Sequence, residues 1–282
     1  MIRFQCDYAE GAHPAILEKL VETNFDQTVG YGLDPYCDSA RAKIKAACNQ
    51  PDADVHFLVG GTQANFTVIS SILRPHQGAL SANTGHINVH ETGAIEATGH
   101  KVLPLYSENG KITAAQVREA YDVHWNDPDH EHVVQPGMVY ISHPTENGTL
   151  YEKDELAALY ETCQELGLPL FLDGARLGYG VMSEAATLTL EDVAKYTDVF
   201  YIGGTKMGAL CGEAVVFHKA CTPKQFMTQL KQHGAMLAKG RLLGLQYCAA
   251  LEDGLYMELA QQALQAANQL SDGLKKLNIP VL

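Results

Sequence analysis

The sequence predicts an α/β fold in which helices cover both faces of a seven-stranded, mainly parallel sheet. Short apolar runs alternate along the chain with segments of helical length, which is typical of strand-helix-strand units. The runs are apolar throughout rather than at every second residue, which indicates strands buried on both faces, as in parallel sheets. With 282 residues, of which 46% are hydrophobic, the chain is long enough to bury a large core.

The elements can be justified in chain order. Pro14 suits the first turn of a helix, and Ile16, Leu17, Leu20 and Val21 then form an apolar stripe. Seven β-rich runs follow and are predicted to be strands, at residues 55–59, 79–82, 102–105, 138–142, 170–172, 199–202 and 214–217.

The segments between the strands are mostly helical. Residues 152–166 place Leu156, Leu159 and Cys163 on one helical face, and Gly167 offers a stop. Residues 125–137 are polar, and we expect a loop there rather than a metal site.

Beyond Lys224 the pattern is entirely helical, with a long helix predicted over residues 254–277. We expect a large cofactor-binding domain at residues 1–250, which includes an N-terminal segment at 1–35. Residues 251–282 are expected to carry the long helix into a small C-terminal domain that is incomplete, since 277–282 resemble the start of an unfinished strand.

Composition narrows the possible partners. Against 33 acidic residues stand only 20 basic ones, and a net charge of -13 disfavours nucleic acid, although a small anionic ligand is still compatible. The sequence has neither a membrane-length apolar run nor a signal peptide at its start, so we expect a cytoplasmic protein with no membrane partner. Seven cysteines without a CxxC pair indicate reduced thiols rather than a disulfide framework.

Chemically distinctive residues follow three of the predicted strands. Gly60, Gly61 and Thr62 open a helix, where backbone amides and a hydroxyl suit a phosphate, although the same pattern fits an ordinary turn. Asp173 follows an apolar strand, where a buried carboxylate is unfavourable without a cationic partner. The alternatives are that Asp173 caps a helix or pairs with Arg176.

The third such residue is Lys206, which lies in a glycine-rich turn after a strand and can form a Schiff base if its amine is desolvated. Alone, it is better explained as an exposed loop lysine. An aspartate for a pyridinium nitrogen, a phosphate turn and a strand-end lysine together match the requirements of pyridoxal 5'-phosphate.

With these motifs in place, the chain resembles the threonine aldolase family, among the fold type I pyridoxal phosphate enzymes and close to the β-eliminating lyases. The matching segments are residues 31–35 (YGLDP), 61–65 (GTQAN), His86 ahead of Glu91, 145–148 (TENG), 173–176 (DGAR) and 205–206 (TK). They extend over nearly the whole chain, from residue 6 to about residue 241.

The resemblance implies a role for each matching residue. Lys206 is expected to hold the cofactor covalently, Asp173 to pair with its ring nitrogen, and His86 to stack on its ring. Gly61, Thr62 and Thr205 are expected to hold the phosphate, and Arg176 to lie beside the phenolic oxygen and the substrate carboxylate. The resemblance also implies that Tyr31 and Cys6 bind the substrate.

Two positions depart from the family. Glu146 stands where relatives carry a histidine, and the hypothesis is that a desolvated Glu146 acts as the base or orients a water; a solvated loop carboxylate is the alternative. Cys6 stands where relatives carry a serine, and a thiol is the weaker hydrogen-bond donor. His86 and His90 share a helical spacing, but without a recognisable third ligand we expect no metal.

The resemblance also bears on assembly. Relatives reach the cofactor phosphate across a subunit interface from the region of residues 231–241, so Lys239 or Arg241 is expected to do so here, unless the segment is a solvated helical face. A homodimer or homotetramer follows. The arginine that the family's C-terminal domain gives to the substrate carboxylate has no counterpart in the sequence.

These observations lead to a predicted function. We expect a pyridoxal phosphate-dependent lyase that cleaves the Cα–Cβ bond of L-threonine or L-allo-threonine and yields glycine and acetaldehyde. Two alternatives stay open: another pyridoxal phosphate-dependent amino acid lyase, such as one catalysing β-elimination, and a homologue that binds the cofactor without catalysis.

Overall fold

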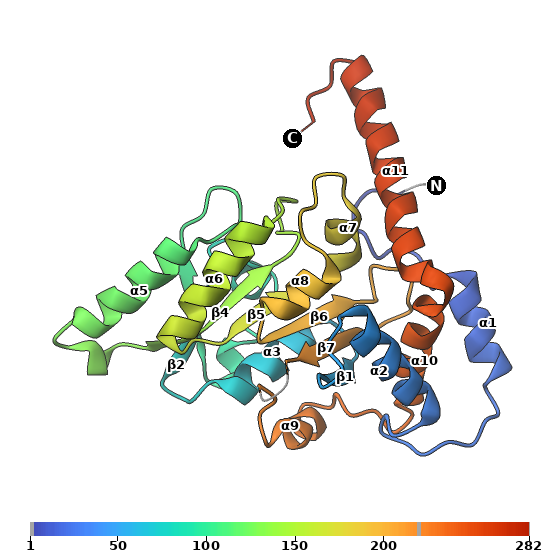
Figure 1. Cartoon of the computed structure of the whole chain (residues 1–282), viewed down its shortest axis with the longest axis horizontal. Helices are drawn as coiled ribbons and strands as arrows, with labels where there is room; N and C mark the ends of the chain where they lie inside the picture. Colours follow the sequence, from blue (N-terminus) through green and yellow to red (C-terminus); the bar gives the residue numbers. More distant parts are fainter. Residues whose placement is uncertain (1–2, 219–220, 282) are drawn as a thin grey trace.

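The computed structural model describes residues 3–218 and 221–281. Its centre is a seven-stranded sheet with the strand order β1-β7-β6-β5-β4-β2-β3 (Figure 1). The strands are β1 (Asp54–Leu58), β2 (Gln77–Ala82), β3 (Lys101–Leu105), β4 (Gln135–Ser142), β5 (Leu170–Asp173), β6 (Val199–Gly203) and β7 (Glu213–Phe217). All seven predicted strands are confirmed, and each boundary lies within three residues of its predicted position.

The sheet is mainly parallel, as predicted. The pairs β2–β3, β2–β4, β4–β5 and β5–β6 are parallel, whereas β7 runs antiparallel to both β1 and β6. Glu213, the first residue of β7, therefore lies beside Leu58 at the end of β1 and Gly203 at the end of β6. The carboxyl edge of the sheet thus gathers the ends of the parallel strands and the start of β7.

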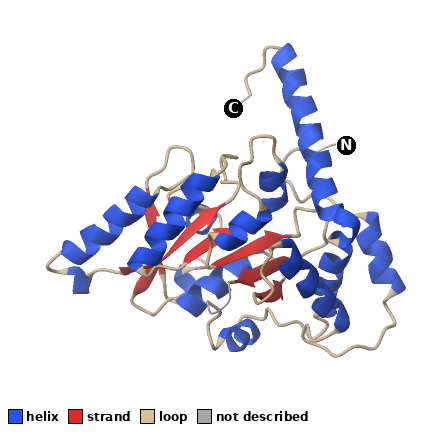
Figure 2. Ribbon diagram, in the orientation of Figure 1, coloured by secondary structure: helices blue, strands red, loops and turns tan. Residues whose placement is uncertain are grey.

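Helices pack on both faces of the sheet (Figure 2). They are α1 (Pro14–Glu22), α2 (Pro35–Ala47), α3 (Gly61–Ile72), α4 (His86–Val89), α5 (Ala114–Asn126), α6 (Lys153–Leu166), α7 (Leu177–Met182), α8 (Leu190–Lys195), α9 (Phe226–Gln232), α10 (Arg241–Ala250) and α11 (Leu255–Lys276), with short 3-10 turns η1 (Glu96–Thr98), η2 (His130–His132) and η3 (Glu252–Gly254). Successive residues of β4 join different cores, since Val139 packs in one cluster and Met138 and Tyr140 in the other. This alternation explains why the strands are apolar at every position.

The predicted helices at 14, at 152–166 and at 254–277 are confirmed. In α6, Glu152 and Glu155 form a capping box at the start, and Gly167 ends the helix in the left-handed conformation with φ 68°. The long helix α11 extends away from the body of the molecule (Figure 1), and only Tyr256 and Ala260 of its 22 residues are buried.

Two predictions about irregular segments need correction. The loop expected at 125–137 is shorter, because Trp125 still belongs to α5 and Gln135 already begins β4. Only Val117 and His124 of α5 are buried, so the polar residues of this surface helix resemble those of a loop. Residues 277–281 form a turn followed by irregular chain rather than a strand, and Leu282 lies outside the described residues.

No helix in the described part of the chain combines the length and the apolar character needed to cross a membrane.

Candidate active site

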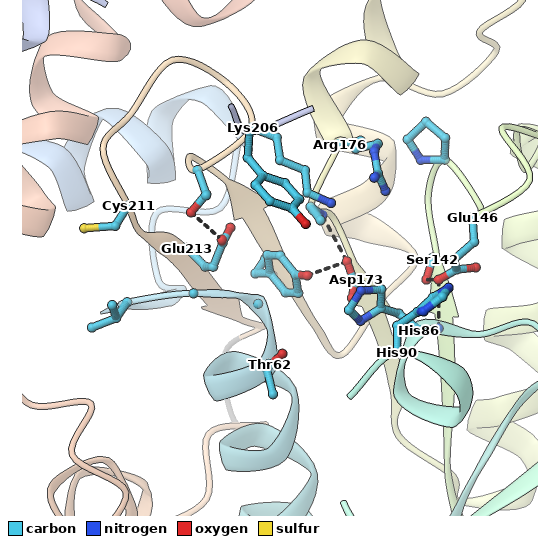
Figure 3. A pocket seen from close by; sticks show the side chains of 18 residues that line it. Thr62, His86, His90, Ser142, Glu146, Asp173, Arg176, Lys206, Cys211 and Glu213 are labelled. Carbon is cyan, nitrogen blue, oxygen red and sulfur yellow. Dashed lines mark hydrogen bonds between the residues drawn. The ribbon is translucent and has the colours of Figure 1, made fainter. Parts of the chain in front are cut away.

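A cavity of about 410 Å³ lies at the carboxyl edge of the sheet (Figure 3). Its size falls within the range typical of small-molecule sites. Eight of the residues predicted for the site line it: Gly61, Thr62, His86, Glu146, Asp173, Arg176, Thr205 and Lys206. They come from segments more than 140 positions apart in the sequence, so the fold brings together what the motifs suggested separately.

Asp173 ends β5 inside the cavity, and its carboxyl group accepts hydrogen bonds from four donors. Its Oδ2 accepts hydrogen bonds from Tyr140 Oη at 2.6 Å and Asn65 Nδ2 at 3.1 Å. Its Oδ1 accepts from the Ala175 amide at 3.0 Å and from the Tyr201 hydroxyl. Burial and the charge of Asp173 raise the pKa of both tyrosines well above its usual value, so both hydroxyls keep their protons as donors.

A second buried carboxylate fixes the ring of His86. Glu91 Oε1 lies 2.7 Å from His86 Nδ1 and accepts a hydrogen bond of 2.7 Å from Asn65 Nδ2. The hydrogen bond to Glu91 raises the pKa of His86, although burial acts in the opposite direction. Because Asn65 also binds Asp173, one amide connects both carboxylates at the wall of the cavity.

Lys206 follows β6 and points its amine into the cavity (Figure 3). Its side chain is only 14% exposed. Burial lowers the pKa of Lys206, and the positive charge of Arg176 lowers it further, while Asp7 and Asp173 oppose the shift. A larger fraction of the amine is therefore neutral than in a solvated lysine, which favours attack on a carbonyl group.

Arg176 is paired with a carboxylate that the sequence did not single out. Its Nε lies 2.5 Å from Oδ2 of Asp7, and Oδ1 of Asp7 lies 3.8 Å from Lys206 Nζ. Burial alone would raise the pKa of Asp7, but the hydrogen bond from Arg176 and the two positive charges outweigh it, so the pKa is lowered. The position between the two cations therefore accommodates a carboxylate.

Glu146 lies in the loop after β4 and is half-buried at the cavity. Its Oε1 accepts a hydrogen bond from the His86 amide at 2.9 Å and another from Ser142 Oγ at 2.6 Å. These two donors fix the carboxyl group beside the cavity (Figure 3). The structure thus supports a held carboxylate rather than a freely solvated one.

The turn between β1 and α3 forms the part of the cavity wall that suits a phosphate. Gly60 is the N-cap of α3 and provides no side-chain cap, so the first helical amides have no side-chain partner at this end. A Cβ atom on Gly61 would lie 3.1 Å from Tyr201 Oη, so glycine allows this turn to approach β6 closely. Unpaired amides at a helix N-terminus favour an anion.

The structure places the other four predicted residues outside this cavity. Cys6 lines a neighbouring cavity that also contacts Lys206, whereas the Tyr31 ring packs under Lys231, whose Nζ lies 4.7 Å from the ring centroid. Lys239 is exposed, and Arg241 donates a hydrogen bond of 2.8 Å to the Asp26 carbonyl. The expected contact of Lys239 or Arg241 with the phosphate of another subunit stays a prediction.

Several residues at the site were not assigned a role from the sequence: Asp7, Asn65, Glu91, Tyr140, Tyr201 and Glu213. A signal existed for Tyr140, Tyr201 and Glu213, because each is a polar residue in a strand that is otherwise largely apolar. Nothing local pointed to Asp7, which reaches Arg176 across 169 positions of sequence.

These residues fit pyridoxal 5'-phosphate. The cavity has the volume for a small cofactor, a carboxylate with four donors at its base, a desolvated amine, and a helix N-terminus without a side-chain cap. Asp173 would hold the ring nitrogen, Lys206 would provide the covalent attachment, and the turn at Gly61 and Thr62 would hold the phosphate.

Comparisons with known proteins agree with the geometry. Residues 4–282 match the family model described as Beta-eliminating lyase. A low specificity L-threonine aldolase from Pseudomonas sp. (strain NCIMB 10558) is 32% identical over 95% of this chain and 77% of its own. A solved structure of the threonine aldolase of Leishmania major has 44% identity and a TM-score of 0.93, over 97% of this chain and 79% of that one. The aspartate aminotransferase of Thermus thermophilus shares the fold, with a TM-score of 0.73 at 16% identity over 96% of this chain and 71% of that one.

Proposed function

The chain belongs to the β-eliminating lyase family, and from that premise we propose that it is a pyridoxal phosphate-dependent aldehyde-lyase. The proposed reaction splits β-hydroxy-α-amino acids such as L-threonine or L-allo-threonine into glycine and an aldehyde. Support for this substrate class comes from the relatives, which are named low specificity L-threonine aldolases. We further propose that residues 1–250 form the cofactor-binding domain.

The observation that carries the proposal is that Asp173 and Lys206 line one cavity from two neighbouring strand ends. The cofactor supplies an electron sink for the electron pair released when a bond to the α-carbon breaks. Asp173, which accepts hydrogen bonds from four donors, would pair with the ring nitrogen, and the Lys206 amine would provide the covalent attachment. His86, whose ring is held by Glu91, would provide a flat surface for the ring of the cofactor.

The remaining side chains of the cavity suit the substrate. Arg176 already binds one carboxylate, that of Asp7, and is proposed to bind the carboxylate of the amino acid. Glu146 is proposed to take the proton from the β-hydroxyl as the Cα–Cβ bond breaks, either directly or through a water. The proton removed from the β-hydroxyl balances the proton that the α-carbon gains, so one amino acid gives one glycine and one aldehyde with no other reactant.

We propose a homodimer or homotetramer as the working assembly. The segment between α1 and α2 exposes Phe25, Val29 and Leu33, which are 92%, 64% and 64% exposed, and Arg241 anchors this segment through the Asp26 carbonyl. An apolar surface of this kind is typical of an interface.

We also propose that the protein is a cytoplasmic enzyme, which fits its seven unpaired cysteines. Its proposed role is threonine catabolism or glycine formation.

The test is a product assay on the enzyme loaded with pyridoxal phosphate. L-threonine should give acetaldehyde and glycine in equal amounts. β-Elimination would instead give 2-oxobutyrate and ammonia from L-threonine, and pyruvate and ammonia from L-serine. Detection of these keto acids as the main products would contradict the aldolase proposal, and a loaded but inactive protein would favour a cofactor-binding homologue without catalysis.

A further inference from the structure

Glu213 is a buried acid in the cavity to which the proposed mechanism gives no role. Its register places it beside Leu58 of β1 and Gly203 of β6, between the turn that opens α3 and the turn that carries Lys206. The residue is only 3% exposed and lines the cavity. In the view of Figure 3 it lies between Lys206 and Thr62. An acid at this position adjoins the part of the wall that suits a phosphate.

The hydrogen bonds around Glu213 meet at Thr205. Glu213 Oε1 lies 2.9 Å from Thr205 Oγ1, and Glu213 Oε2 accepts a hydrogen bond of 3.3 Å from the Gly204 amide. Thr205 Oγ1 also accepts a hydrogen bond of 3.2 Å from the Gly212 amide. The Thr205 hydroxyl therefore has one lone pair in use, while its single proton and its other lone pair are available to Glu213 and the cavity.

The protonation state of Glu213 decides whether the Thr205 hydroxyl can donate a hydrogen bond to a phosphate. A threonine hydroxyl donates one hydrogen bond and accepts two. If Glu213 is ionised, Thr205 must donate its only proton to Glu213 and has none for a phosphate oxygen. If Glu213 is protonated, it can donate to the second lone pair of Thr205, which frees the Thr205 proton for the phosphate.

We propose that Glu213 is a positioning residue that donates a hydrogen bond to Thr205 and thereby frees the Thr205 hydroxyl to donate to the cofactor phosphate. The inference rests on the proposed cofactor site, and it adds a pH-dependent preference for the phosphorylated form of the ligand.

The charges around Glu213 agree with this role. The net pKa of Glu213 is raised to about 8, mainly by burial and also by the charge of Asp173, although the hydrogen bonds of Thr205 and Gly204 and the charge of Lys206 lower it. Tyr201 of β6, Tyr247 of α10 and Tyr256 of α11 face the same region, and burial raises the pKa of each, so they stay neutral. Cys211 completes this part of the wall. The proton of Glu213 is thus present at neutral pH and is lost as pH rises through about 8.

The experiment compares two probes that lack the aldehyde, so that Lys206 cannot attach to them: 4-deoxypyridoxine 5'-phosphate and 4-deoxypyridoxine. Dissociation constants are measured by fluorescence titration, and the ratio between the two probes isolates the phosphate contact. Titrations that change only the binding of the ring cancel in this ratio, and the phosphate is a dianion throughout because its second pKa is about 6. Between about pH 7 and about pH 9.5 the preference of the wild type for the phosphorylated probe should fall about tenfold, the value of one charge-assisted hydrogen bond.

In Glu213→Gln the preference should change less than about twofold over the same range, because the amide remains a donor to Thr205 at every pH. Thr205→Val lacks the hydroxyl, so its preference for the phosphorylated probe should already be low at neutral pH and should not fall further as the pH rises. Thr62→Val is the matched control: it removes a hydroxyl from the same cavity, so it should lower the preference but keep the pH dependence of the wild type.

The outcomes separate this inference from the proposed function. If the wild type binds the phosphorylated probe with a preference that does not change with pH, or if Glu213→Gln loses preference as the wild type does, Glu213 has no such role, although the cofactor site stands. If the wild type binds neither probe, the cofactor site itself is wrong. Should Glu213→Gln fail to fold, Thr205→Val decides, since a pH dependence that persists without the Thr205 hydroxyl overturns the inference.

Discussion

The Asp7 carboxylate is paired with Arg176, with Oδ2 2.5 Å from Nε, and its other oxygen faces the Lys206 amine at 3.8 Å. One acidic side chain from the N-terminal segment thus binds both cations on which the proposed chemistry depends. If Arg176 receives the carboxylate of the substrate, Asp7 must first release it.

Replacing Asp7 should therefore make substrate binding easier. In Asp7→Asn we expect the KM for L-threonine to fall by up to about fivefold, because a partly exposed ion pair is worth at most about 1 kcal/mol. Steady-state kinetics with the loaded enzyme measure this. Asp272→Asn, which alters an exposed acid on α11, is the control and should leave KM unchanged. A rise in KM for Asp7→Asn would mean that Asp7 helps to bind the substrate.

Asp173 should contribute more to turnover than any single hydrogen-bond donor that holds it. Asp173→Asn removes the charge opposite the ring nitrogen and should lower kcat by at least about 100-fold. Tyr140→Phe removes one donor of four and should lower kcat by about tenfold. Tyr106→Phe, on the exposed surface, is the control. Equal losses in Tyr140→Phe and Tyr106→Phe would show that the Tyr140 hydroxyl does not support Asp173.

Glu146 can be tested as the base. Glu146→Gln keeps the shape of the side chain but cannot take a proton, so the rate of L-threonine cleavage should fall by about 100-fold or more. Binding of the cofactor, followed by its absorbance, should remain. Glu131→Gln, at an exposed residue of the turn η2 before β4, provides the comparison. Unchanged cleavage in Glu146→Gln would remove Glu146 from the mechanism.

The pair of His86 and Glu91 should make stability depend on pH. The pKa of His86 is raised above its ordinary value of 6.5, mainly by the hydrogen bond to Glu91, so the folded state binds this proton more tightly than the unfolded state. The stabilisation is complete below about pH 6.5 and is lost as pH rises through the raised pKa.

Denaturant unfolding of the cofactor-free protein measures this effect. The free energy of unfolding of the wild type should exceed that of His86→Asn by more at about pH 6 than at about pH 9. His132→Asn, a change at an exposed histidine, should show no such trend. A difference that grows with pH would contradict the assignment.

Much of the fold was readable from the sequence because its signals are local. Each buried strand is a continuous apolar run, and the residues placed at strand ends, such as Asp173 and Lys206, follow from the geometry of a parallel sheet. The limits of α5 were missed because a surface helix with two buried residues has a weak apolar pattern.

The site was only partly predictable because its contacts join residues that lie far apart in the sequence. The side chains that donate to Asp173 come from α3, β4 and β6, and the partner of Arg176 lies in the N-terminal segment. No short motif therefore contains both members of any of these side-chain pairs. Glu213 reaches the carboxyl edge only because β7 runs antiparallel, which the sequence did not indicate.

The attachment point of the cofactor tests the account most directly. The loaded protein is reduced with borohydride, digested, and searched by mass spectrometry for a phosphopyridoxyl group. We expect the group on Lys206, and we expect Lys206→Ala to lose both the label and the yellow absorbance, whereas Lys231→Ala, a lysine outside the cavity, keeps them. A label on a different lysine, or a label that survives in Lys206→Ala, would contradict the assignment of the cavity as the cofactor site.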